Sequence, residues 1–587
     1  MNPIAVAIEV LMNALRALRN LLSVLLPAPE FVVLQISGTL PERRPAPPGM
    51  LRRRFLPFAP PPPESLEEWR ERLRLLASEP RVKGIIIKVG DLHAGLTSLE
   101  SLRHALQHFR ESGKGLAAYL PTTDLYAYYL ASVADPIVVP ESGELFLHGP
   151  RLEATFLRIA LDRLGIIPQF HHIAEYKSAA NRFLYPEMPE AQREMTTSLL
   201  DSVFGEVTAA IARARGLSVD AVRQGIDQGI LSAAEAKDRK LIDAVAFEDD
   251  LPRLLAHRPG SPRSGPGPAL RRGSGQGGGD RLARILPWAQ ARRHIRIPYR
   301  WQSLRRQAIG VVQLVGTIVP GESRELPFPL PLFGPHIAGH ETIGRAFRLA
   351  EKLPAIKAIV FHVDSGGGSA VASDLIWREV TRVQRNKPVV VYMGNVAGSG
   401  GYYVGCGARH IVAGATTVTG SIGVVAGKFN AQGLYAKGGL RREVIAQGET
   451  ATMFSGFTSF TEQEWNTLRR WMEEIYLRFK ERVAAGRGRP VGEIETVARG
   501  RVWTGRQAVE RGLVDEIGDF EAAVRKAKAL AGIPVDADVP LVTVRPPKVS
   551  GVPAAPAAAW SEAWRAVATL LNEQTWLLLP PEFLLPQ

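Results

Sequence analysis

A serine in a turn of small residues is a possible nucleophile. Ser399 lies within Gly394–Gly401, which follows the apolar run Val389–Met393. The apolar run predicts a buried strand, and the small residues allow the backbone to turn sharply. If a helix begins after the turn, its free amides and its dipole favour negative charge at the serine oxygen. The alternative is a Gly/Ser turn that only connects a strand to a helix.

A second glycine-rich turn could bind an anion. It reads Asp-Ser-Gly-Gly-Gly-Ser over 364–369 and follows the predicted strand Ala358–Val363. Successive backbone amides in such a turn can form an anion-binding nest. A glycine run is weak evidence alone, and this one lacks the Gly-Lys-Ser/Thr ending of a nucleotide-binding loop.

A nucleophilic serine needs a base, which could be a histidine or a lysine held neutral. His362 lies inside a predicted strand and His410 abuts another, so the pattern favours structural roles for both. The lysine candidate is Lys177. To act near neutral pH, its pKa must fall from about 10.4 to roughly 7 or 8, which burial can achieve.

The elements that carry these residues occur twice along the chain. Adding 274 to a position carries Pro80 onto Pro354 and Tyr128 onto Tyr402, with small gaps elsewhere. In both copies, apolar strand patterns alternate with helical patterns, which favours a largely parallel sheet flanked by helices. The fold class predicted for the chain is therefore α/β, in two tandem repeats.

The two copies differ where the chemistry would occur. The position that corresponds to Ser399 falls at Leu125 or Tyr126, so only the second copy carries the serine and the glycine nest. Lys177 belongs to the first copy, and its counterpart segment in the second, 446–454, holds no lysine. Each copy keeps one half of a possible dyad.

Four short motifs together resemble the long, tandem form of bacterial signal peptide peptidase A. They occur in order at Tyr176–Ala179, Asp364–Ser369, Ala397–Tyr402 and Thr419–Val424. The resemblance covers both copies. It implies a serine peptidase with a Ser/Lys dyad, on a fold like the Clp protease and crotonase proteins, assembled as a bowl-shaped tetramer on the membrane. Members of that family cut the remnants of signal peptides.

The same resemblance implies a role for five residues. Ser399 matches the nucleophile and Lys177 the general base. Gly368 and Gly400 match the glycines whose amides form the oxyanion hole, and Ser421 matches a serine that orients the lysine amine. The chemistry would require no metal and no other cofactor.

Two positions depart from the family pattern. Gly366 stands where the family usually has proline, and Ala174 and Glu175 precede the Tyr-Lys pair where a glycine is common. The first departure puts the rigidity of the oxyanion loop in doubt. Neither removes a reacting group.

The formal net charge of +14 is concentrated in one stretch. Residues 251–307 hold thirteen arginines and one aspartate, with prolines and glycines that predict a flexible linker. No aromatic residues are interleaved as in an RNA-binding module, so we expect no nucleic-acid partner. Attraction to anionic lipids and a solvated linker without a partner both remain open. The single cysteine, Cys406, excludes an intrachain disulfide.

Both ends of the chain contain amphipathic patterns. The first 26 residues place polar side chains on about a third of a helix and apolar ones on the rest, which predicts a helix lying in a membrane interface. Packing against protein is the alternative for this segment and for Trp560–Leu579. The predicted parts are 1–30, a membrane-associating helix; 31–250, the repeat with the lysine; 251–307, the linker; 308–545, the repeat with the serine; and 546–587, a tail with an amphipathic helix.

The sequence thus predicts a membrane-associated serine endopeptidase that hydrolyses hydrophobic peptides, such as released signal peptides, through an acyl-enzyme. By the resemblance, the expected partners are those peptides, a membrane surface and further copies of the chain, at a bacterial inner membrane with peripheral or N-terminal attachment. Two rival classes are a crotonase-like enzyme acting on acyl-thioesters and a membrane scaffold without catalysis.

Overall fold

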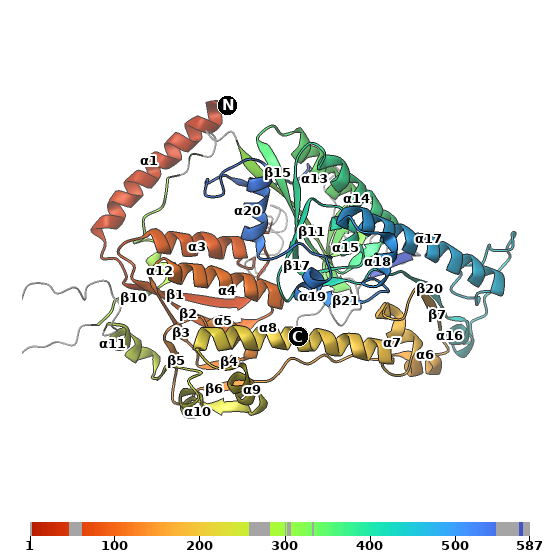
Figure 1. Cartoon of the computed structure of the whole chain (residues 1–587), viewed down its shortest axis with the longest axis horizontal. Coiled ribbons are helices and arrows are strands. Elements are labelled where there is room, and N and C mark those ends of the chain that lie inside the picture. Colours follow the sequence, from red (N-terminus) through yellow and green to blue (C-terminus); the bar gives the residue numbers. More distant parts are fainter. Residues whose placement is uncertain are drawn as a thin grey trace, which may run out of the picture. The chain divides into compact units, whose positions relative to one another are not determined.

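The computed structural model describes residues 3–45, 62–256, 282–299, 301, 307–330, 334–547 and 575–578. The chain forms two compact units, each built from two segments of sequence. Unit 1 comprises Met1–Pro150 and Phe204–Leu304, and unit 2 comprises Arg151–Val203 and Arg305–Gln587. Figure 1 labels many of the helices and strands of both units.

Unit 1 is centred on a six-stranded sheet in which every neighbouring pair is parallel. Residues of its central strands, such as Ile85 and Ile87, are fully buried, as expected where helices cover both faces of a parallel sheet. The sheet order is β10 (Ile285–Pro287), β1 (Phe31–Gly38), β2 (Gly84–Leu92), β3 (Gly115–Tyr119), β5 (Ile137–Val139) and β9 (Ala244–Val245). The helices include α3 (Leu66–Ser78), α4 (Leu96–Glu111) and α5 (Leu125–Ala131).

Unit 2 contains a larger sheet. All of its neighbouring strands are parallel except β19 and β21, the antiparallel pair at one end. Its order is β21 (Val502–Thr504), β19 (Val418–Gly420), β17 (Val389–Gly398), β15 (Ile356–Ser365), β11 (Ala308–Val315) and β23 (Leu541–Thr543). β18 (His410–Ala413) and β22 (Glu516–Ile517) extend it beside β17. The flanking helices include α13 (His340–Lys352), α14 (Ala370–Val383), α17 (Glu462–Arg487) and α20 (Phe520–Leu530).

A second, seven-stranded sheet in unit 2 carries β16, which contains Gly368, and β7, which leads to Lys177. Its order is β13 (Arg324–Leu330), β14 (Gly334–Gly339), β12 (Thr317–Val319), β16 (Gly367–Ser369), β24 (Thr575–Leu578), β20 (Val425–Asn430) and β7 (Ile167–His172). The presence of β24 corrects part of one prediction. The stretch 575–578, expected to be helical, is a strand because it pairs on both sides, and residues 548–574 and 579–587 of the predicted tail lie outside the described residues.

Equivalent contacts in the two repeats confirm the predicted tandem α/β fold. Tyr128 donates a hydrogen bond to the carbonyl of Leu241 at 2.6 Å, and Tyr402 donates one to the carbonyl of Leu513 at 2.8 Å. In each repeat an aspartate further along, Asp243 or Asp515, accepts a backbone N–H from the strand that follows the tyrosine's helix, β5 or β18, and pairs with an arginine. Equivalent hydrogen bonds therefore join equivalent elements in the two repeats.

The compact units do not coincide with the predicted parts. Residues 151–203 come from the first repeat but belong to unit 2, because β7 pairs along its length with β20 of the second repeat. The predicted linker, 251–307, also contains ordered structure: α11 (Leu251–Ala256) buries Leu251 and Leu255, and β10 adds a strand to β1. The apolar residues of α11 and β10 fold onto unit 1, although the stretch as a whole is rich in arginine. Residues 257–281 lie outside the described residues.

The N-terminal helix α1 (Pro3–Leu25) turns its polar side toward unit 1 and its apolar side outward. The Asn13 and Ser23 residues are only 5% and 1% exposed, whereas Leu11, Leu18 and Leu21 are 62%, 58% and 65% exposed. The apolar side of this helix is therefore not covered by the described part of the chain. None of the helices that the structure describes has the length and apolar character needed to cross a bilayer.

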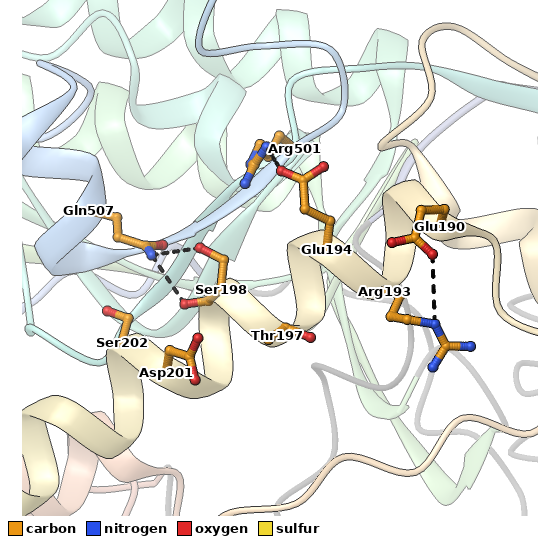
Figure 2. Close-up of a pocket in the computed structure, with 9 residues that line it drawn as sticks. All are labelled: Glu190, Arg193, Glu194, Thr197, Ser198, Asp201, Ser202, Arg501 and Gln507. Carbon is orange, nitrogen blue, oxygen red and sulfur yellow. Dashed lines mark hydrogen bonds and ion pairs between the residues drawn. The ribbon is translucent and has the colours of Figure 1, made fainter.

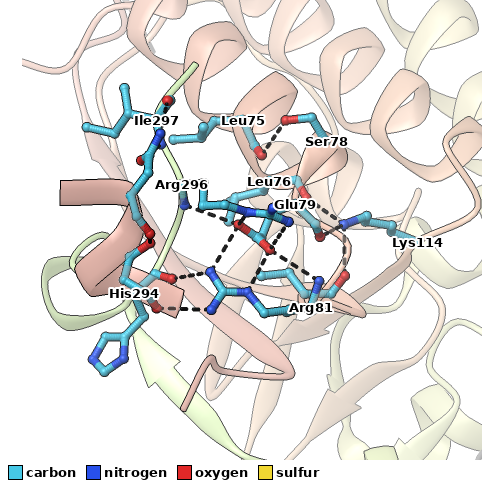
Figure 3. A network of polar contacts seen from close by, with 12 residues as sticks. Leu75, Leu76, Ser78, Glu79, Arg81, Lys114, His294, Arg296 and Ile297 are labelled. Atoms are coloured by element: carbon cyan, nitrogen blue, oxygen red, sulfur yellow. Dashed lines mark hydrogen bonds and ion pairs between the residues drawn. The ribbon is translucent and has the colours of Figure 1, made fainter. Parts of the chain in front are cut away.

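A buried carboxylate holds this end of unit 1 together (Figure 3). Glu79 accepts hydrogen bonds from Arg81 Nε at 2.9 Å and from the backbone N–H of Arg296 at 3.1 Å. Arg81 also donates to the carbonyls of Ser23 in α1, at 3.0 Å, and of His294, at 2.7 Å. Burial alone would raise the pKa of Glu79, but the bonds from Arg81 and Arg296 outweigh it and lower the pKa from 4.5 to about 2.

We expect Glu79→Gln to lower the free energy of unfolding by about 2 kcal/mol at pH 7, because two guanidinium groups lose their carboxylate. The folded-state pKa lies below the unfolded one, so this contribution is complete above about pH 4.5 and is lost as the pH falls toward 2. Thermal unfolding from pH 7 to pH 2.5 measures it. Glu71→Gln, at a half-exposed partner of Arg44, is the control and should cost under about 0.5 kcal/mol. Equal effects of the two variants would contradict the assignment.

Candidate active site

Ser399 lies at the junction of β17 and α15 (Gly400–Gly405), as the turn pattern predicts. Its backbone has φ 54° and ψ −114°, a conformation that costs a residue with a side chain on the order of 1–3 kcal/mol. Its N–H donates to the carbonyl of Gly420 at 2.8 Å, which fixes the turn against β19. This hydrogen bond holds the turn in its strained conformation. The Ser399 side chain is fully buried.

Lys177 reaches this serine from the segment that follows β7. Its Nζ lies 2.6 Å from Ser399 Oγ, 3.0 Å from Ser421 Oγ and 3.0 Å from the carbonyl of Ser421. All three residues belong to unit 2 and are 0% exposed. The structure therefore brings the predicted pair together within one chain, with Ser421 beside it.

Burial governs the protonation of the lysine. Desolvation lowers the pKa of Lys177 well below its ordinary value of 10.5. A neutral amine has a lone pair that can accept the hydroxyl proton of Ser399, whereas an ammonium has none. The candidate histidines are engaged elsewhere: His410 Nε2 lies 2.9 Å from Glu516 Oε2, and His362 stacks on Tyr392.

Two glycines leave room for the lysine, and the sequence analysis did not single them out. A Cβ on Gly500, where φ is +76°, would lie 2.5–2.6 Å from the backbone N, Cα and Cβ of Lys177. A Cβ on Gly423 would lie 3.1 Å from Lys177 Cδ. Gly423 lies within the motif Thr419–Val424, but no local pattern distinguishes Gly500 from an ordinary turn glycine.

The two predicted oxyanion glycines also lie next to each other. A Cβ on Gly400 would lie 3.1 Å from the backbone nitrogen of Gly368 and 2.7 Å from Ser373 Oγ, so no side chain fits between the two segments. A Cβ on Gly368 would lie 2.0 Å from the carbonyl oxygen of Ile318 in β12. Gly400 also begins α15, where the first amides of a helix have no partner within the helix.

A buried aspartate is hydrogen-bonded to β17, the strand that precedes the turn at Ser399. Asp364, at the end of β15, accepts hydrogen bonds from the backbone N–H of Val396 at 3.1 Å and from Asn395 Nδ2 at 3.2 Å. Burial is the largest influence on this carboxyl and raises its pKa from 3.8 to about 6, although these two bonds oppose the rise. Asp364 therefore links the loop that holds Gly368 to β17, the strand that ends directly before Ser399.

Helix α8 (Glu190–Arg215) begins in unit 2, where it fastens the lysine-bearing segment to the second repeat (Figure 2). Arg501 Nη1 donates to Glu194 Oε1 at 2.8 Å, and Gln507 Nε2 donates to Ser198 Oγ at 3.0 Å. The carbonyl of Arg501 accepts the N–H of Ser421 at 2.7 Å. Glu194, Ser198, Arg501 and Gln507 line an open cleft of about 680 Å³, and none of the five predicted site residues lines it.

Comparison with known proteins adds independent findings. The model of peptidase family S49 matches the chain twice, over residues 108–259 and 381–534, which together make up more than half of it. The serine protease SPPA, chloroplastic, of Arabidopsis thaliana is 30% identical over 83% of this chain and 68% of that protein. Protease 4 of Haemophilus influenzae is 30% identical over 77% of this chain and 71% of that protein.

Among solved structures, a mutant of ClpP1 from Listeria monocytogenes matches 37% of this chain and 94% of its own, with 14% identity and a TM-score of 0.23. The α/β repeats and these relatives define a serine peptidase. The chain belongs to peptidase family S49, whose domain it contains twice.

We expect Gly500→Ala to lower kcat/KM for peptide hydrolysis at least 100-fold, because the new methyl group must displace the backbone of Lys177. The matched control is Gly488→Ala, at the C-terminal end of α17. Gly488 also has a positive φ, +63°, but no atom lies within 4 Å of the added Cβ. Gly488→Ala should lose about 1 kcal/mol of stability from backbone strain. Gly500→Ala should lose more, because the methyl group also overlaps the backbone of Lys177, and only Gly500→Ala should lose activity in conditions where both variants remain folded. Equal activities would show that Lys177 does not depend on Gly500.

Proposed function

We propose that Ser399 is the nucleophile and Lys177 the general base of a Ser/Lys dyad. The 2.6 Å separation of Lys177 Nζ and Ser399 Oγ carries this proposal, together with the burial that favours a neutral amine. A crotonase-like enzyme acting on thioesters would need the oxyanion amides but not this contact. A scaffold without catalysis would not need to bury a lysine against a strained serine.

The reaction begins when Ser399 Oγ attacks the peptide carbonyl and its proton passes to Lys177 Nζ. A tetrahedral intermediate forms, whose oxyanion accepts hydrogen bonds from the amides of Gly368 and Gly400; such donors contribute several kcal/mol each to transition-state stabilisation, roughly 3 on average. Lys177 then returns the proton to the leaving amine as the C–N bond breaks, which leaves an acyl-enzyme. A water molecule, deprotonated by the same lysine, hydrolyses the ester and regenerates Ser399.

Ser421 orients the lysine. Its hydroxyl and its carbonyl both lie 3.0 Å from Lys177 Nζ, so the amine's own hydrogens have acceptors while its lone pair faces Ser399. Ser421 has a positive φ of 52°, held by its N–H donating to the carbonyl of Arg501. Ser421 is therefore a positioning residue in this mechanism.

The substrates are extended, hydrophobic peptides such as the remnants of signal peptides. This assignment follows from the four-motif resemblance. An extended peptide can add as a strand to an exposed edge and thereby gain main-chain hydrogen bonds. The resemblance also implies a tetramer at a bacterial inner membrane.

Membrane attachment is supported by the orientation of α1. Its polar side bonds to protein: Asn20 Nδ2 donates to the carbonyl of Ile297 at 2.9 Å, and Asn20 Oδ1 accepts the N–H of Ile297 at 2.8 Å. Its apolar side chains then face outward. The exposed Arg292 and Arg293 lie in the adjoining segment, where they can meet anionic headgroups. A lipid surface fits both the apolar side and these charges.

We expect Ser399→Ala and Lys177→Met each to reduce peptide hydrolysis by at least 10³-fold, and labelling by a serine-directed acylating probe to require Ser399. Lys177→Met should also raise the unfolding temperature at pH 7. The folded-state pKa lies below 10.5, so the unfolded chain binds a proton that the folded chain does not, and stability rises with pH through this window. The gain should therefore vanish near pH 10.5. Full activity of either variant would overturn the dyad.

We expect Leu18→Glu to weaken binding to vesicles of neutral and anionic lipids about tenfold, because it removes an apolar side chain and adds a charge on the outward side of α1. The matched control is Ile230→Glu, at a residue that is 53% exposed, compared with 58% for Leu18. It should leave vesicle binding unchanged. Co-sedimentation measures both, and an equal loss in the two variants would assign α1 another partner.

A further inference from the structure

Three side chains form a closed set of contacts next to the candidate base. The hydroxyl of Tyr176, the residue before Lys177, donates to Glu194 Oε2 at 2.8 Å. Arg501 Nη1 donates to the other oxygen of the same carboxylate, also at 2.8 Å (Figure 2). The guanidinium of Arg501 lies 4.7 Å from the centre of the Tyr176 ring, which closes the set. Tyr176, Glu194 and Arg501 together form a latch between α8 and the segment that carries the lysine.

Arg501 is connected to Lys177 through its backbone as well as its side chain. Its carbonyl accepts the N–H of Ser421 at 2.7 Å, and the hydroxyl of Ser421 lies 3.0 Å from Lys177 Nζ. The residue before it is Gly500, where an added Cβ would touch the backbone of Lys177. A displacement of Arg501 would therefore move both a hydrogen-bond partner of the amine and the segment against the lysine backbone.

Stacking contributes more to the latch than its ion pair does. The Glu194 side chain is 52% exposed, and an exposed ion pair alone contributes little because water and salt screen it. The Arg501 side chain is only 19% exposed, and its guanidinium also lies 4.7 Å from the ring centre of Trp503. A planar guanidinium can stack on rings and bond a carboxylate at once, which a lysine ammonium cannot do.

Tyr176 also packs against a small apolar cluster that includes the strand leading to the nucleophile. Met195 is fully buried in this cluster, and its Sδ accepts the N–H of Val502 at 3.2 Å. Val396 belongs to β17, which ends directly before Ser399. The cluster comprises Met195, Leu199, Val396 and Val502. The latch is therefore packed against the elements that carry both halves of the proposed dyad.

We propose that Tyr176, Glu194 and Arg501 are positioning residues that hold Lys177 away from water, and that opening the latch hydrates the amine. Glu194 and Arg501 line the open cleft, whereas Lys177 is 0% exposed and does not line it. The latch thus has solvent on one side and the neighbours of the lysine on the other. This inference rests on the proposed function of Lys177 and adds to it the contacts that keep the base dry.

The charged groups beside the lysine are paired with one another. Glu175 and Arg499 form an ion pair at 2.8 Å, and Glu194 pairs with Arg501. The bonds from Tyr176 and then from Arg501 lower the pKa of Glu194 from 4.5, so this carboxylate stays ionised at neutral and alkaline pH. The latch itself therefore does not titrate where the lysine does.

Two other titratable groups lie on elements packed around the lysine. Asp364, at the end of β15, has a pKa of about 6, because burial raises it. His172, in β7, has its Nδ1 2.8 Å from the carbonyl of Ala174. Substitutions in the latch leave both groups in place, so a shift of the pH profile between variants reports Lys177.

The test compares two stacked arginines. Arg501→Ala should raise the midpoint of the acid limb of kcat/KM for an apolar peptide by about one pH unit or more, because a hydrated amine returns toward its ordinary pKa of 10.5. Below the original midpoint the rate should fall about tenfold or more, and well above the new midpoint it should recover to within about threefold. The matched control is Arg511→Ala. Arg511 lies 3.9 Å from the ring centre of Trp503 and bonds Glu510, outside the latch.

The control should leave the midpoint unchanged. A midpoint that stays the same in Arg501→Ala, with the rate lowered equally at every pH, would show a merely structural role and would overturn the proposal. An equal shift in Arg511→Ala would overturn it as well.

Two conservative variants cover the case in which Arg501→Ala folds poorly. Arg501→Lys keeps a cation for Glu194 but cannot stack as a plane on Tyr176. Tyr176→Phe keeps the ring and loses only the bond to Glu194. Each should move the midpoint upward by roughly half a pH unit. Unchanged midpoints in both variants, with the unfolding temperature retained, would also contradict the proposal.

Chemical labelling separates this inference from the catalytic one. At about pH 10, part of even an ordinary amine of pKa 10.5 is neutral, so the rate at which acetic anhydride labels Lys177 measures its access to solvent. In the Ser399→Ala background, mass spectrometry should show labelling of Lys177 about tenfold faster in Arg501→Ala than in Arg511→Ala. Turnover by Ser399→Ala would refute the dyad and leave this comparison intact. Equal labelling rates with an inactive Ser399→Ala would refute the latch and leave the dyad intact.

Discussion

The burial of one amine against one hydroxyl is the constraint on which the candidate site depends. In water, the amine of Lys177 would be protonated at neutral pH and could not accept a proton from Ser399. At 0% exposure, desolvation lowers its pKa, and Ser421 supplies acceptors for a neutral amine. The same burial reduces the stability of the fold, because the unfolded chain is free to protonate the lysine. In the proposed mechanism, this loss of stability accompanies a lysine that can act as a general base.

Such a lysine must also be held in place, because a buried polar group that can move will find water or another partner. Three features hold it. The ladder between β7 and β20 fixes the strand before it, the contacts of Glu194 and Ser198 with Arg501 and Gln507 fix the helix after it, and Gly500 allows the two segments to touch. All of them join residues 151–203 to the second repeat. The proposed dyad is thus divided between the two repeats, but both of its residues lie within one compact unit.

The sequence was sufficient to predict the two α/β repeats, because long apolar strands and the offset of 274 residues are strong, regular signals. It also singled out Ser399 and Lys177, since one repeat has each residue and the other lacks it. It could not predict that 151–203 would leave its own repeat, because β7 finds its partner more than 250 residues away and pairing over that distance has no local pattern.

Two further features depend on such distant partners. The periodicity of α1 showed a polar and an apolar side, but only the bonds between Asn20 and Ile297 show that the polar side is the one against protein. The run Thr-Trp-Leu-Leu at 575–578 suits a helix or a strand equally by periodicity. Its pairing with β16 and β20 decides in favour of the strand, and neither neighbour is close in sequence.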